Sequence, residues 1–199
     1  VFLPILIYSS ETKLAVGVVM NYYYLQSDAG AFTKPSNLMP TLIYTQQQQI
    51  SVEMPAELYW QNELYYLSGY IGYAKFPDKF YGIGNDTKET NEQNYTPRIF
   101  QIRANMQRKL SAGTYAGLKV NLKYHNILDV EDGELQSSRG IVGRGAGTAL
   151  GLGVSLTRDT RNSVFYPSTG TLFKIVVQRF DGFIGSDYDF TKVSADVRG

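Results

Sequence analysis

Hydrophobic and polar residues alternate along most of this chain. In residues 150–157, leucine and valine alternate with glycine, serine and threonine. The same period of two recurs in residues 14–25, 99–110, 114–125 and 188–199. Successive side chains of a β-strand point to opposite faces of a sheet, so this period is typical of strands rather than helices. The pattern therefore predicts an all-β protein.

Noisier alternation in residues 41–54, 64–75 and 171–180 brings the expected number of strands to about eight. The segment 41–54 has a defect, because Gln46 and Gln48 fall in phase with apolar residues on either side. A bulge or a register shift at this point would restore the alternation. The strands are expected to be long, about 10–12 residues, and a strand that crosses a membrane needs ~9–11.

The connections between these strands differ in length. Long polar connections are expected near residues 26–38, 77–94 and 126–147. Shorter ones are expected near 55–63, 112–113 and 159–170. Long loops at one end and tight turns at the other are typical of outer-membrane β-barrels, as are aromatic residues near strand ends. The fold class predicted is therefore an antiparallel transmembrane β-barrel.

A soluble β-sandwich or lipocalin-like barrel is the alternative, because its strands also alternate. In that case the apolar face would fill a core, and the protein would bind a small apolar ligand. In a membrane barrel the same face would contact lipid. Strand length, loop lengths and the high tyrosine content, 16 residues, favour the membrane barrel.

Composition narrows the chemistry further. The formal net charge of +1 gives no indication of nucleic-acid binding. With no cysteine and a single histidine, neither a zinc site nor a histidine-based catalytic triad can be assembled. The glycines of "GRGAGTALGLG" precede a strand, unlike those of a phosphate-binding loop, and the acidic "DVEDGE" lacks EF-hand spacing. We expect no enzyme activity, cofactor or metal.

Several motifs carry a family resemblance. The stretch "DTRNSVFYPSTG" resembles the Asp-x-Arg…Pro-x-x-Gly turn of the BamA/TamA superfamily of bacterial surface-antigen barrels. "PILIYSSETKLAVGVVMNYYY" is similar to the entry into those barrels, and "FPDKFYGIGNDT" is similar to one of their loops. The order of the motifs is more specific than any one of them. The resemblance implies that residues 1–199 are the N-terminal part of one barrel domain, with a first strand at 14–25 and an unpaired last strand at 188–199.

The resemblance also implies a function and a location. Members of the superfamily insert or translocate proteins at the bacterial outer membrane, so the implied partners are lipid, client outer-membrane or secreted proteins, and periplasmic accessory proteins. A passive outer-membrane pore or anchor remains the alternative within the same fold.

Two groups of residues are candidates for a structural or functional role. Asp159, Arg161, Pro167 and Gly170 are expected to shape a periplasmic turn. Pro167 fixes its own φ, and Gly170 permits a positive φ before the next strand. Four residues on polar strand faces are expected to line the lumen: Arg103, Lys119, Asn121 and Lys123.

Overall fold

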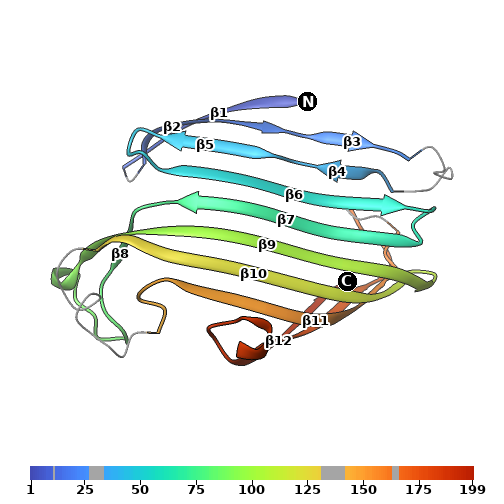
Figure 1. The fold of residues 1–199 in the computed structure, drawn as a ribbon. Coiled ribbons are helices and arrows are strands. Elements are labelled where there is room, and N and C mark those ends of the chain that lie inside the picture. Colours follow the sequence, from blue (N-terminus) through green and yellow to red (C-terminus); the bar gives the residue numbers. More distant parts are fainter. Residues whose placement is uncertain (11, 27–33, 131–141, 163–165) are drawn as a thin grey trace.

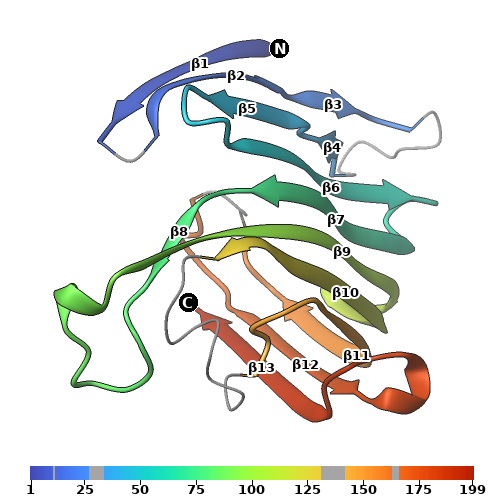
Figure 2. The same ribbon diagram turned by 60° about the vertical axis from the view of Figure 1, so that its left-hand side comes forward.

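The computed structural model describes residues 1–10, 12–26, 34–130, 142–162 and 166–199. Thirteen strands form a single antiparallel sheet, shown in Figure 1. The strands of its main path, in spatial order, are β1 (Phe2–Ser9), β2 (Lys13–Met20), β5 (Thr41–Thr45), β6 (Ile50–Trp60), β7 (Tyr65–Lys75), β9 (Gln93–Ser111), β10 (Thr114–Val130), β11 (Gly147–Asp159), β12 (Leu172–Phe180) and β13 (Phe190–Arg198). The sheet curls into part of a barrel wall, as Figure 2 shows. The all-β barrel fold is confirmed.

Three short strands extend this path. β3 (Tyr22–Tyr24) continues the line of β2 and pairs with β4 (Ser36–Leu38), which also pairs with β6. β8 (Asp78–Phe80) pairs with the start of β9. Two 3₁₀ turns, η1 (Glu89–Asn91) and η2 (Gly182–Ile184), lie in connections between strands. In the described part of the chain, no helix is long and apolar enough to cross a membrane.

Two of the sequence predictions about strands were wrong. The first strand is β1, not residues 14–25, and it pairs along its whole length with β2. The expected single strand 41–54 is two strands, because a tight turn at residues 46–49 separates β5 from β6. Gln48 there adopts a φ of 60°, and the amide of Gln48 donates to the carbonyl of Thr45. The defect in alternation therefore marks a hairpin, and the main path holds ten strands instead of eight.

The hairpin at residues 46–49 also changes which end of the sheet each connection occupies. Strand β3 ends at the same end of the sheet as β11, and β7 and β10 end at the opposite end (Figure 1). The prediction that 26–38 shares an end with 77–94 and 126–147 was therefore wrong. An extra strand reverses the chain direction, so every earlier connection moves to the other end.

The apolar face of the sheet is its exposed face. Leu118, Val154 and Val193 lie in one cross-strand row and are 68%, 58% and 62% exposed. A soluble barrel would bury such a row in its core at ~25 cal/mol per Å². A membrane barrel presents it to lipid, where exposure carries no such penalty. The arrangement therefore fits the membrane barrel and not the soluble alternative.

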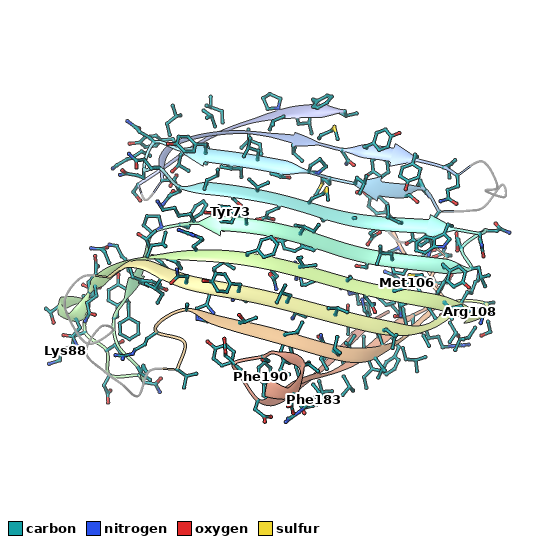
Figure 3. The ribbon with its side chains drawn as sticks, viewed as in Figure 1. Tyr73, Lys88, Met106, Arg108, Phe183 and Phe190 are labelled. Atoms are coloured by element: carbon teal, nitrogen blue, oxygen red, sulfur yellow. The ribbon has the colours of Figure 1, made fainter. Side chains whose placement is uncertain are left out.

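Aromatic residues mark both limits of this apolar face. Tyr73, Phe100 and the facing Tyr124 form a row across β7, β9 and β10. Near the other end, Tyr65 stacks on Trp60 with ring centroids 5.9 Å apart. Tyr65 and Tyr73 are separated by eight residues of β7, or about 27 Å at roughly 3.4 Å per residue. A strand tilt of ~40° reduces this to about 21 Å, close to the ~25 Å apolar band of outer-membrane barrels. Figure 3 shows Tyr73 and Met106 toward opposite ends of this face.

Candidate functional site

The opposite face of the sheet is polar and closely packed. Its buried side chains include Gln107, Ser155 and Asn105, which are 1%, 4% and 3% exposed. They form a directed series of hydrogen bonds: Gln107 Nε2 donates to Ser155 Oγ (3.2 Å), which donates to Asn105 Oδ1 (2.7 Å). Gln107 also donates to Thr157 Oγ1 (3.0 Å). The series links β9 to β11 across β10, because Gly117 lies between them and has no side chain.

Cationic side chains share this face with the network. Arg103 lies with its guanidinium 4.0 Å from the centroid of the Tyr70 ring. Lys119 interacts electrostatically with Arg103 and with two further lysines, Lys174 and Lys192. We call Arg103, Lys119, Lys174 and Lys192 the cation cluster. In the described residues, no carboxylate lies within ion-pair distance of any of its members.

The four residues expected to line the lumen occupy this polar face, but they do not form one group. Arg103 and Lys119 belong to the cation cluster. Asn121 lies in register with Arg103 and accepts a 3.4 Å hydrogen bond from Gln101. Lys123 lies farther along β10, at a hollow that His125 and Asp78 also line. Whether this face borders a barrel lumen stays a proposal.

Sequence reasoning missed the residues that complete the site. Lys174 and Lys192 lie on β12 and β13, and only the strand register brings them near Lys119 on β10. Asn105 and Gln107 fall at polar positions of an alternating strand, so the pattern placed them on the correct face. Nothing in the pattern indicated that they would be fully buried.

The connection from β11 to β12 holds the other predicted group. Arg161 donates from Nε and Nη2 to the two carboxylate oxygens of Asp159 at 2.8 and 3.0 Å. The Arg161 backbone amide also donates to Asp159 Oδ1 (3.2 Å). Hydrogen bonding to Asp159 raises the pKa of Arg161. The Arg161 side chain is 9% exposed, so this pair is better shielded than an ordinary surface ion pair.

Gly170 and Asn162 shape the same connection. Gly170 has a φ of 88°, and a Cβ at this position would overlap the carbonyl oxygen of Thr160. Asn162 Oδ1 accepts from the amides of Ser168 (3.0 Å) and Thr169 (3.2 Å), so it caps the turn. Pro167 is exposed. The geometry is that of a specific turn, and its orientation toward the periplasm stays a prediction.

Strand β1 forms one edge of the sheet. In the described residues it pairs with β2 and with no other strand, and β13 pairs with β12 alone. Large apolar side chains are exposed on both faces of β1, with Leu6 73% exposed on one face and Ile7 54% exposed on the other. The ladder behind it is short and interrupted. β2 pairs with β5 from Ala15 to Val19, and β3 pairs with β4 from Tyr22 to Tyr24, whereas the β9–β10 pairing extends from Tyr95 to Ser111.

Comparisons with known proteins agree with this architecture. The Omp85 superfamily domain matches residues 20–199. A solved structure, BamA from Haemophilus ducreyi lacking POTRA domains 1–3, is similar with a TM-score of 0.54 and 12% sequence identity. The similarity covers 96% of this chain and 35% of that chain, so this chain spans about a third of the length of that solved chain. At this identity the similarity supports the fold alone. No curated protein sequence matches the chain.

Proposed function

The chain belongs to the Omp85 superfamily, and we propose that its barrel inserts or translocates other proteins at the bacterial outer membrane. The clients would be outer-membrane or secreted proteins rich in β-structure, delivered by periplasmic accessory proteins. The barrel itself would be embedded in lipid through the exposed apolar face.

The edge of β1 is the observation that carries this proposal. An unpaired strand edge presents a row of backbone N–H and C=O groups, which another strand can pair with by β-augmentation. In lipid, each unsatisfied backbone group costs several kcal/mol, so an incoming strand would gain stability there. Exposed apolar side chains on both faces of β1 suit a surface that a client strand would cover.

The short pairing of β2 with β5 supports the same role. Displacing an edge strand requires breaking its own ladder or moving the adjacent strands with it. A short ladder behind β1 and β2 makes this movement less costly than anywhere near β9 and β10, where the ladder is long. The N-terminal strands are therefore the part of the sheet best suited to opening.

A photocrosslinking experiment tests the proposal. A photoreactive amino acid replaces Leu6 on β1 of the full-length protein in cells, and covalent adducts are identified by mass spectrometry. The matched control is Leu118, which has a similar exposure, 68%, but lies in the middle of the sheet. We expect adducts with nascent outer-membrane proteins from position 6 and only lipid or background from position 118. Equal client adducts from both positions would refute a specific role for the β1 edge.

A passive pore is the second candidate, and the polar face with its cations favours it. Depletion of the protein separates the two functions. Loss of an insertion factor should lower the amounts of many outer-membrane proteins together, whereas loss of a pore should change solute uptake and leave those amounts unaltered.

A further inference from the structure

The cation cluster has an excess of positive charge, and no carboxylate of the described residues forms an ion pair with it. Lys119 lies among Arg103, Lys174 and Lys192, and all four carry the same charge. Lys174 faces Asp196 across the β12–β13 ladder, but that carboxylate is bound by Arg198 at 2.7 Å. Like charges without ion-pair partners on a partly buried surface destabilise one another.

A cavity of about 250 Å³ opens at this cluster. Its charged and amide-bearing lining residues are Arg103, Lys119, Lys174 and Asn105, and none of its lining residues is acidic. It is large enough to hold a side chain and a length of backbone, since one water molecule occupies only ~30 Å³ of liquid. The cavity is therefore basic and able to hold an anionic group.

A buried amide donor at the cavity is an independent indication. Asn105 Nδ2 is buried and has no hydrogen-bond partner. Gln107 donates to Ser155, and Ser155 Oγ donates to Asn105 Oδ1. The series therefore ends at Asn105, whose NH₂ group has no acceptor within it. Gln178 Nε2, in the same cross-strand row, is a second buried donor without a partner. Buried amide donors left unpaired cost ~1–3 kcal/mol each, so a ligand with acceptors would be stabilised here.

Arg103 is oriented to take part. Its guanidinium carbon lies 4.0 Å from the centroid of the Tyr70 ring, a cation–π contact. The N–H groups of a guanidinium match the two oxygens of a carboxylate. The ammonium, guanidinium and amide groups at the cavity are all hydrogen-bond donors. A carboxylate complements them because both of its oxygens are acceptors.

We propose that the cation cluster binds a carboxylate of an aspartate or glutamate carried by a polypeptide segment inside the barrel. The carboxylate would accept from Asn105 Nδ2 and Arg103, and it would neutralise part of the charge of Lys119 and Lys174. The segment could belong to the same protein or to a client in transit. The inference depends on the polar face bordering the lumen, and it does not depend on client insertion at β1.

Carbodiimide crosslinking of the full-length protein in outer membranes tests the inference. The reagent joins a lysine amine to a carboxylate only when the two are in direct contact. The ion pair of Lys79 and Glu92, whose Nζ and Oε1 atoms are 2.7 Å apart, is the internal positive control. We expect Lys119 to be crosslinked to an aspartate or glutamate, located by mass spectrometry.

The outcomes distinguish the sources. A crosslink within one polypeptide assigns the carboxylate to the protein itself, and a crosslink to another polypeptide assigns it to a client. Crosslinking of Lys79 without any crosslink at Lys119 overturns the inference, including the case in which only a free anion occupies the cavity. The β1 photocrosslinking experiment is unaffected by this result, so failure of one proposal does not imply failure of the other.

A pair of variants tests the geometry. Asn105→Asp keeps an acceptor for Ser155 and replaces the free amide with a carboxylate oxygen. The cavity lining then carries a negative charge of its own, which competes with the carboxylate of the bound segment. We expect the crosslink of Lys119 to its original partner to fall several-fold. Asn37→Asp, on the same face but on β4 and outside the cavity lining, should leave that crosslink unchanged. An equal effect of both substitutions, or no effect of either, would contradict the assigned site.

Discussion

The phenyl ring of Phe180 covers Gly151 on the adjacent strand. The two residues are in register across β11 and β12, and Phe180 is 3% exposed. A Cβ at position 151 would lie 2.6 Å from the ring. Gln178 lies against Gly153 in the same way. The glycines on the polar face of β11 therefore make room for larger side chains of β12, which explains why one face of this strand is apolar and the other almost bare.

Substitution of Gly151 should disturb this packing. Gly151→Ala is expected to reduce the free energy of unfolding in lipid vesicles by ~1–3 kcal/mol, because the added methyl group must displace the Phe180 ring. In a Phe180→Ala background the same substitution should be nearly neutral, since the coupled partner is gone. Gly145→Ala is the control, because no atom lies within 4 Å of a Cβ there. Equal losses in both backgrounds would contradict the contact.

The turn should require glycine at position 170 for two reasons, the positive φ of the backbone there and the lack of space for a Cβ. Gly170→Val is expected to slow assembly and to lower protease resistance, because valine resists a positive φ and its Cβ would overlap the Thr160 carbonyl. Gly84 also has a positive φ, 109°, but lies in open space. Gly84→Val should therefore have the smaller effect on the rate of heat-resistant barrel formation. Normal assembly of the Gly170 variant would rule out this account of the turn.

The apolar face should tolerate bulk but not charge. Val120 lies midway between the two aromatic rows. Val120→Arg is expected to cost ~2–4 kcal/mol of folding free energy in lipid vesicles, the penalty for arginine at a lipid-facing midplane position. Asn121→Arg, on the opposite face of the same strand, should cost much less. Urea titrations of both variants in vesicles would measure the difference. A larger loss for the Asn121 variant would reverse the assignment of the faces.

Fluorescence quenching tests the same assignment directly. Trp60 is the single native tryptophan, so the measurement uses a Trp60→Phe background. In that background we expect Leu118→Trp to fold normally and to be strongly quenched by brominated lipid. Asn121→Trp should be quenched weakly, because its indole would lie on the polar face. Similar quenching at both positions would show that the two faces are not separated by the membrane.

Protonation of Asp181 should loosen the β12–β13 connection. The Phe183 amide donates to Asp181 Oδ1 (2.9 Å) and Arg179 donates to Oδ2 (2.9 Å), and together they lower the pKa of Asp181. Because this pKa is lowered, the stabilisation by ionised Asp181 is present at neutral pH. It is lost as the pH falls through the pKa of Asp181 in the folded protein, which lies below the ordinary ~3.9. The amide shift of Phe183 should titrate with a midpoint below that value. Asp181→Asn should abolish the titration, and a midpoint at or above ~3.9 would contradict the contact.

The sequence by itself determined the strands and the chemical character of their faces. Alternation is a local property, because the pleat sends successive side chains to opposite sides whatever the strand pairs with. Leu118 and Asn105 could therefore be assigned to apolar and polar faces from the pattern alone. The resemblance carried by the turn motif indicated the barrel family, which the match over residues 20–199 supports.

The same locality explains the errors near the N-terminus. The segment "VFLPILIY" has no alternation, so its role as edge strand β1 was not visible. The turn at residues 46–49 uses glutamines in place of glycine or asparagine, and Gln48 adopts a positive φ that few non-glycine residues adopt. Only hydrogen bonding between β5 and β6 distinguishes this hairpin from a bulged strand.

Tertiary structure alone decided which distant residues meet. Strand register places Lys174 and Lys192 near Lys119, and side-chain direction joins Asn105 to Ser155 across an intervening strand. Register depends on the pairing of whole strands, and a slip of one residue would exchange the two faces. The cation cluster and its unpaired amide donor are consequences of that register, which no single strand contains.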